Sequence, residues 1–339
     1  MKKFLKILIF ILVLLLILAI VLMFVSPAQL KLQQTKTLEG PPNMAYNVVN
    51  DFSTWESWSP WAKMDPDAVN TYTEKTSGVG AVWKWKGDPK SVGEGSQKIV
   101  ESKEGEKIRT ELEFVGWDGL SYSDWIFEKA GDKTKATWTF EGAETPFYMR
   151  PINLFMKGGL KKTYAEGLTN LDGLLKKRVE EKVYRGYKIN EIDLPEKHYV
   201  INRAEIKIEN IQQFYTQNLG ALFGKLQGSN IEMDGMPSGL FFKWNQTSET
   251  TDMAASIPVK EEVAIKGASS YTIPAGKALR IDFYGDYSKT ANAHYALDDY
   301  MRDYGLLNNP PMVEEYVTDP TEEKDPEKWL TKITYYIAE

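Results

Sequence analysis

The chain has 339 residues, which suggests two domains and an additional segment, because a single hydrophobic core rarely grows beyond about 250–300 residues. Its net charge is −6, and three of its lysines precede an apolar run at the N-terminus, so the remainder is more acidic still. An acidic body argues against nucleic acid as a partner, since phosphate binding needs a concentrated positive surface. The absence of cysteine excludes disulfides, thiol catalysis and cysteine-based metal sites.

The first feature in chain order is an unbroken apolar run at residues 7–25. As a helix it spans roughly 28 Å, close to the thickness of a bilayer's hydrocarbon core. Lys2, Lys3 and Lys6 precede it, and such residues favour the cytoplasmic side. A cleaved signal peptide, the alternative, would have a shorter apolar region and a better cleavage site than Val25-Ser26-Pro27-Ala28. We expect residues 1–28 to be a single-pass cell-membrane anchor, with a cytoplasmic N-terminus and the domains on the extracytoplasmic side.

Residues 29–182 are expected to form one α+β domain. A strand over Leu30–Gln33 and a helix opened by Pro41-Pro42 begin it. Alternating runs at residues 81–85, 111–114, 123–128 and 136–140 predict antiparallel strands. The period then becomes helical over residues 151–181, which predicts a long amphipathic helix lying on the concave face of the sheet.

Three segments of this domain form a recognisable set: the tryptophan motif from Phe52 to Trp61, the segment from Gly78 to Trp85, and Val92-Gly93-Glu94-Gly95-Ser96. Together they resemble the START-like polyketide cyclase superfamily (SRPBCC). The resemblance implies a helix-grip fold, commonly with a hydrophobic cavity between helix and sheet, and it includes no catalytic signature. Trp55, Trp58 and Trp61 would either line the mouth of that cavity or seal one end of the sheet.

Residues 183–339 show a weak internal repeat of two β-α-β-β units. The first unit is predicted to contain strands at 184–192 and 199–208, a helix at 211–226, and strands at 239–244 and 253–259. The second is predicted to contain strands at 263–265 and 277–284, a helix at 288–304, and strands at 312–317 and 331–337. Together the three parts predict an α+β protein: a transmembrane helix, a START-like domain and a duplicated second domain.

The second half of this repeat contains several motifs in order: Ala275-Gly276-Lys277-Ala278-Leu279, Gly285-Asp286-Tyr287, residues 293–300, residues 314–320 and Asp325-Pro326-Glu327-Lys328-Trp329. These motifs resemble the GyrI-like effector-binding domain. The family is related to the ligand-binding part of multidrug-responsive transcription regulators. Those regulators contain a helix-turn-helix region, whereas this chain has a membrane anchor and a START-like domain. The resemblance therefore implies binding of a small molecule and no direct contact with DNA.

The resemblance also implies that a glutamate before a tyrosine on a late strand points into a central pocket, and Glu315-Tyr316 matches that position. Glu314 is the alternative, because alternation along a strand places the two carboxylates on opposite faces. A carboxylate among aromatic walls is poorly solvated and should seek a cation. The expected ligand is therefore hydrophobic, amphipathic or cationic.

Four aromatic residues on predicted strands are candidates for the pocket wall: Phe242, Trp244, Tyr284 and Tyr316. Each could equally pack in the core or at an edge. Strand periodicity predicts that Phe242 and Trp244 share one face.

Two other function classes stay open. Some relatives of the GyrI-like domain hydrolyse electrophilic small molecules, which would make Glu315 the general base and Tyr284 or Tyr316 its helper. A non-catalytic interaction module would instead have both interiors filled by side chains. Only His198 and His294 could supply imidazole, and no metal-ligand spacing is present, so we expect no metal and no cofactor. His294 is expected to pack or to be exposed.

Overall fold

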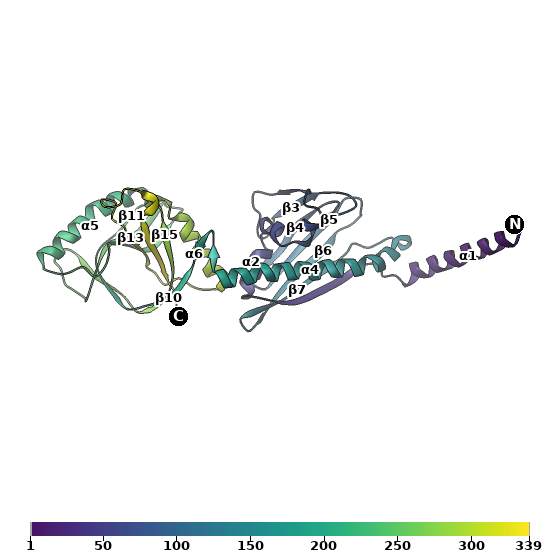
Figure 1. Ribbon diagram of the computed structural model, residues 1–339, viewed down its shortest axis with the longest axis horizontal. Helices are drawn as coiled ribbons and strands as arrows, with labels where there is room; N and C mark the ends of the chain where they lie inside the picture. Colours follow the sequence, from purple (N-terminus) through teal and green to yellow (C-terminus); the bar gives the residue numbers. More distant parts are fainter. Residues whose placement is uncertain (1, 339) are drawn as a thin grey trace. The chain divides into compact units, whose positions relative to one another are not determined.

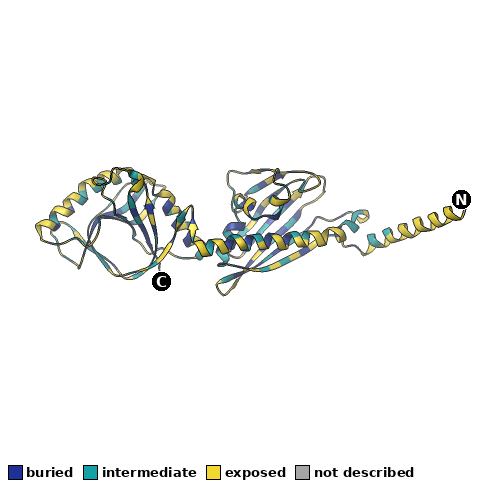
Figure 2. Cartoon of the chain, in the orientation of Figure 1, coloured by how far each residue is buried: buried dark blue, intermediate teal, exposed yellow. Residues whose placement is uncertain are grey.

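The computed structural model describes residues 2–338, which divide into two compact units that meet between Glu180 and Glu181 (Figure 1). The first unit begins with helix α1 (Lys2–Val25), which is exposed along almost its whole length (Figure 2). Its stretch Lys3–Val25 is long and apolar enough to cross a membrane, and a signal sequence would have the same properties. α1 is thus a candidate membrane span.

A seven-stranded antiparallel sheet forms the body of the first unit, in the order β1-β7-β6-β5-β4-β3-β2. Its strands are β1 (Lys31–Leu38), β2 (Val69–Tyr72), β3 (Val82–Lys86), β4 (Glu94–Lys103), β5 (Lys107–Phe114), β6 (Ser121–Ala130) and β7 (Lys133–Glu141). The helical segments are α2 (Pro42–Val49), η1 (Phe52–Ser57), α3 (Pro60–Met64), η2 (Phe147–Met149) and α4 (Pro151–Glu181). The long helix predicted over residues 151–181 is therefore present, and the sequence pattern missed β2 and β4.

Aromatic side chains fill the space between α4 and this sheet. Trp138 of β7 stacks on Trp125 of β6 at a centroid distance of 4.3 Å and on Tyr164 of α4 at 4.0 Å. Trp55 and Trp58 of the tryptophan motif are 2% and 1% exposed and pack edge-on against Trp125. These two tryptophans are core residues of the domain, as the packing interpretation of their motif predicts.

The second unit contains an eight-stranded sheet in the order β10-β15-β17-β16-β12-β13-β11-β14 and a small two-stranded sheet of β8 and β9. Its strands are β8 (Val183–Tyr184), β9 (Tyr187–Lys188), β10 (Asn190–Leu194), β11 (Lys197–Lys207), β12 (Ser238–Asn245), β13 (Thr250–Val259), β14 (Ser269–Ile273), β15 (Gly276–Tyr284), β16 (Met312–Tyr316) and β17 (Leu330–Tyr336). Its helical segments are η3 (Ile208–Asn210), α5 (Ile211–Gly228), η4 (Tyr287–Lys289), α6 (Ala291–Tyr304) and η5 (Pro326–Lys328).

The duplication is visible in the pairing of these strands. Each half contributes a long strand, a helix and two further strands, and the halves join where β12 pairs with β16. The short leading strands are exchanged: β10 pairs with β15 of the second half, and β14 pairs with β11 of the first. The predicted strand at residues 263–265 is wrong, since this segment is irregular and the leading strand of the second half is β14.

Both long helices of this unit cover the same face of the sheet, which we call the helix-covered face. Leu222 and Leu226 of α5 pack in a cluster with β11 and β13, and Leu297 of α6 packs in a cluster with β15 and β17. A separate apolar cluster that includes Tyr199 and Tyr336 lies on the opposite face. Residues of the central strands β12 and β16 thus face either the helices or the opposite side, according to alternation.

Candidate functional site

A buried carboxylate lies on the helix-covered face, at the junction of the two halves. Glu314 of β16 is 7% exposed, and its Oε1 lies 2.7 Å from Nε2 of His294, on α6. Its Oε2 accepts a hydrogen bond of 2.7 Å from the hydroxyl of Tyr316, two residues further along the same strand. Burying a carboxylate is costly unless it is paired and hydrogen-bonded, and these two contacts supply that compensation.

Tyr215 extends this group from the other helix. Its hydroxyl lies 2.9 Å from the hydroxyl of Tyr316, and the two rings meet edge-to-face at 5.5 Å. Gly239 makes the approach possible, because a Cβ at this position would lie 2.0 Å from the Tyr215 hydroxyl oxygen. Gly239 is also the cross-strand neighbour of Glu314. One residue from each helix and two from β16 therefore converge on one point.

Further aromatic groups surround this cluster. Tyr335 of β17 places its hydroxyl 3.1 Å from Nδ1 of His294. The ring of Tyr287 lies 5.1 Å from that of Tyr316 and 4.9 Å from that of Trp329. Rings and polar groups from five elements thus surround the carboxylate: α5, η4, α6, β16 and β17.

One buried hydroxyl next to this group has no partner. Thr331 is 0% exposed, pairs with Tyr316 across β16 and β17, and its Oγ1 makes no hydrogen bond. A buried polar group without a partner is destabilising, and a bound polar atom would satisfy it. We call Glu314, Tyr316, Tyr215, His294 and Tyr335 the Glu314 cluster.

The phenols of the cluster stay protonated at neutral pH. Burial raises the pKa of Tyr316 well above its usual value, and the negative charge of Glu314 raises it further. Burial and then Glu314 act on the pKa of Tyr215 in the same direction. Both residues are therefore hydrogen-bond donors rather than bases.

Glu315 points to the opposite face of the sheet. Its Oε1 lies 3.9 Å from Nζ of Lys197, and its carboxylate acts electrostatically on Tyr199 and Tyr336. Tyr316 does not share this face, so it belongs with Glu314. The structure therefore places the two carboxylates in different surroundings, one beside a lysine and the other beside a histidine and phenols.

The other predicted wall residues are dispersed. Phe242 packs edge-on against Tyr271 at 5.2 Å, with the guanidinium of Arg203 3.5 Å above its ring. The prediction that Phe242 and Trp244 share one face is wrong, because the pairing of β12 shifts at a bulge between Phe241 and Lys243. Trp244 consequently lies near Phe241, with ring centroids 6.1 Å apart.

Tyr284 lies at the end of β15 and is 62% exposed. It is separated from Glu315 by the intervening strand β17. The pair proposed for hydrolysis, Glu315 and Tyr284, therefore comes from non-adjacent strands.

Three residues of the cluster were not predicted as site residues: Tyr215, Tyr335 and His294. Of these, His294 was expected to pack or to be exposed. A usable signal was their place in the repeat, since Tyr215 and His294 both lie in the first two turns of equivalent helices. Tyr335 carries no such signal, because one more tyrosine on an apolar strand resembles core packing.

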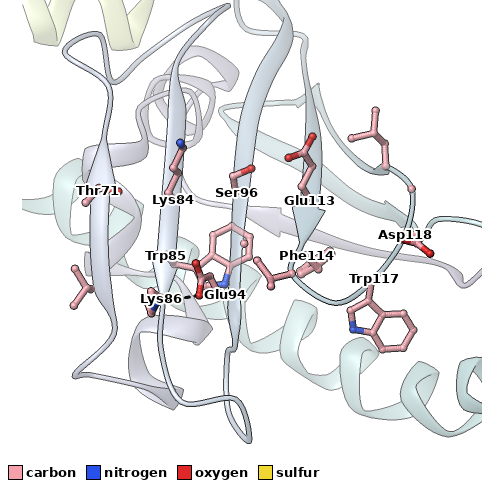
Figure 3. Close-up of a pocket in the computed structure, with 15 residues that line it drawn as sticks. Thr71, Lys84, Trp85, Lys86, Glu94, Ser96, Glu113, Phe114, Trp117 and Asp118 are labelled. Carbon is pink, nitrogen blue, oxygen red and sulfur yellow. Dashed lines mark ion pairs between the residues drawn. The ribbon is translucent and has the colours of Figure 1, made fainter.

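The first unit offers a different kind of site. Its interior is occupied by the aromatic cluster described above, and a shallow hollow of about 730 Å³ lies over β2–β5 and the loop at residues 115–120. Figure 3 shows Trp85, Phe114 and Trp117 beside charged side chains there, including the 3.3 Å ion pair of Lys86 and Glu94. A second hollow of about 530 Å³ lies beside β11 and α5. Neither hollow is lined by Glu314, which is enclosed by its neighbours.

No metal site is formed within residues 2–338. No three side chains of histidine, aspartate and glutamate there gather closely enough to hold an ion. The Glu314 cluster has one carboxylate and one imidazole, which is fewer than the ligands that a zinc site needs.

Comparison with known proteins agrees with this division. Residues 29–176 match the family model for polyketide cyclase / dehydrase and lipid transport, and residues 187–337 match that for the GyrI-like small molecule binding domain. No curated protein matches the chain.

Among solved structures, the EcmrR C-terminal domain is similar at 16% identity, over 45% of this chain and 98% of that chain, with a TM-score of 0.41. Protein CV1439 from Chromobacterium violaceum is similar at 18% identity, over 43% of this chain and 97% of that chain, with a TM-score of 0.33. A hydrolase from Listeria innocua is similar at 15% identity, over 48% of this chain and 98% of that chain, with a TM-score of 0.34. The two family matches thus show a polyketide cyclase-like domain at residues 29–176, followed by a GyrI-like domain at residues 187–337.

Proposed function

We propose that this protein binds a small amphipathic or cationic molecule at the Glu314 cluster and is held at the membrane by α1. The observation that carries the proposal is the buried carboxylate of Glu314, with its histidine partner and its surrounding phenols. The GyrI-like family match supports small-molecule binding in this unit. The length and composition of α1 support the membrane attachment.

The chemistry of the cluster favours a ligand with a positive charge. Among the described residues, His294 is the only ion-pair partner of Glu314. An imidazole is positively charged only when it is protonated. A ligand cation can therefore supply a full positive charge opposite Glu314. The faces of Tyr316 and Tyr287 add attraction for a cation, and the rings provide apolar contact for its substituents.

Glu315 is the weaker candidate for this role. Its carboxylate already has the ammonium group of Lys197 at 3.9 Å, so a ligand cation would have to compete with a fixed charge of the protein. We therefore propose Glu314 as the ligand-binding carboxylate in place of Glu315. Tyr316 is kept as a ligand-binding residue, and Phe242, Trp244 and Tyr284 are not part of the proposed site.

The test compares a lipophilic cation with a neutral molecule of similar shape. The full chain in bilayer nanodiscs is heated with tetraphenylphosphonium or with triphenylphosphine oxide, and the unfolding temperature of the second unit is followed. A ligand at 100 times its dissociation constant adds about 2.7 kcal/mol to the stability of the folded state. We expect the cation to raise the unfolding temperature and the neutral compound to leave it nearly unchanged. Equal shifts with both compounds would contradict the role of charge.

A further inference from the structure

Large apolar side chains are exposed where α1 joins the rest of the first unit. Five of them lie in η2 and the first turns of α4, and we call them the juxtamembrane patch: Phe147, Tyr148, Leu154, Phe155 and Met156. Phe155 is 76% exposed and Tyr148 is 68% exposed. Residues 154–159 of α4 are exposed, whereas the helix has buried side chains from Tyr164 to Leu175. Exposed apolar clusters of this kind indicate an interaction surface.

The patch is fastened to the end of α1 by specific contacts. The side-chain amide of Asn153 donates a hydrogen bond of 2.9 Å to the carbonyl oxygen of Pro27. The backbone N–H of Thr145 donates to the carbonyl oxygen of Ala28 at 2.8 Å. The ring of Phe24, in the last turn of α1, meets the ring of Phe147 edge-on at 5.0 Å. The residues that follow the apolar helix are therefore held against the start of α4.

This attachment determines what covers the patch when α1 spans a bilayer. Because the hydrocarbon segment ends near Val25, side chains held beside Phe24 and Pro27 lie at the level of the lipid headgroups. Aromatic rings are enriched at this level, and basic side chains next to an apolar face bind anionic headgroups. The exposed lysines Lys157, Lys161 and Lys162 follow the patch along α4.

We propose that the juxtamembrane patch inserts into the headgroup region of the bilayer beside α1. The sheet domain of the first unit then lies on the lipid surface and is not connected to the bilayer by α1 alone. The partner is a phospholipid bilayer, and the inserted side chains are led by Phe155 and Tyr148. This inference rests on the proposed membrane attachment through α1. The patch is then a second contact with the bilayer, at its interface, in addition to the membrane span of α1.

The test measures the depth of four single positions in the full chain. Because the chain contains no cysteine, Tyr148→Cys and Phe155→Cys each provide one unique site for a fluorescent label. Leu16→Cys labels the middle of α1, and Val115→Cys is the matched control, since Val115 is 68% exposed in the same unit and lies outside the patch. Each variant is reconstituted in phosphatidylcholine–phosphatidylglycerol vesicles. Quenching by spin-labelled lipids is compared with quenching by aqueous iodide.

We expect the labels at 148 and 155 to lie about 5–10 Å below the headgroup boundary, as an interfacial helix does, and the label at 115 to be in water. A deep label at 16 with aqueous labels at 148 and 155 would overturn the inference and leave the anchor intact. An aqueous label at 16 would overturn the anchor and this inference together. Lipid quenching at 115 equal to that at 148 would overturn the assignment to this patch.

Discussion

At the scale of single residues, Tyr316 is the side chain on which the cluster depends most. It donates to Glu314, its hydroxyl lies beside that of Tyr215, and its ring meets the ring of Tyr287 edge-to-face. Replacing a hydroxyl that bonds to a buried charged group typically costs about 1–3 kcal/mol, because the remaining partner is left unsatisfied. We expect Tyr316→Phe to lower the free energy of unfolding by this amount, as measured by urea denaturation.

The same residue predicts how stability changes in alkali. The pKa of Tyr316 is raised above its ordinary value of 10.0 by burial and then by Glu314, so the folded state retains a proton that the unfolded state releases. The stabilisation is complete below pH 10 and is lost as the pH rises from there towards the folded pKa. Between pH 9 and 11.5, wild type should lose stability more steeply than Tyr316→Phe, by no more than about 1.4 kcal/mol per pH unit. Parallel curves would contradict a buried, protonated phenol at this position.

The sequence alone does not predict which of the two carboxylates of β16 faces the helices. Alternation correctly places Glu314 and Glu315 on opposite faces, but it does not say which face the helices cover. Both faces of β16 are partly buried, so neither carboxylate is marked by an exposed neighbour. Distinguishing them requires the positions of Tyr215 and His294, which lie on helices far away in sequence.

At the scale of elements, Gly239 determines how closely α5 approaches β12. An added Cβ would meet the hydroxyl of Tyr215, which must then leave Tyr316. We expect Gly239→Ala to destabilise the second unit by about 1–3 kcal/mol, the usual cost of overpacking. Gly220→Ala is the control, since no atom lies within 4 Å of its Cβ position and alanine favours a helix by about 0.5–1 kcal/mol.

A double-mutant cycle tests this contact directly. Tyr215→Phe removes the atom that the new Cβ would meet, so Gly239→Ala should cost at least about 1 kcal/mol less in that background than in wild type. Additive losses in denaturation experiments would show that Tyr215 and Gly239 do not touch.

Elements differ in how well their sequence predicts them. The amphipathic period of α4 and the proline at its start predicted the whole helix, because both signals are local. The bulge in β12 has no such signal: Phe242, Lys243 and Trp244 follow a regular alternation, and only the pairing with β13 shows the shift. The prediction that Phe242 and Trp244 share one face is wrong for this reason.

At the scale of the whole molecule, each unit has its own core. The second unit contains three apolar clusters built from its own strands and helices, and the Glu314 cluster is made entirely within it. We therefore expect a fragment of residues 181–339 to unfold in one cooperative transition, as measured by circular dichroism. The fragment should also bind tetraphenylphosphonium with a dissociation constant within about twofold of that of the full chain. A folded fragment without binding would show that the first unit contributes to the site.

We expect Glu314, rather than its neighbour Glu315 on the other face of β16, to bind the ligand. Isothermal titration of tetraphenylphosphonium into the nanodisc-bound full chain is compared among wild type, Glu314→Gln and Glu315→Gln. Losing a charge-assisted contact of about 1.5–3 kcal/mol should raise the dissociation constant of Glu314→Gln by about 10–100-fold, and Glu315→Gln should change it by about twofold or less. A large loss in Glu315→Gln with wild-type binding in Glu314→Gln would contradict this account and place the ligand on the opposite face of the sheet.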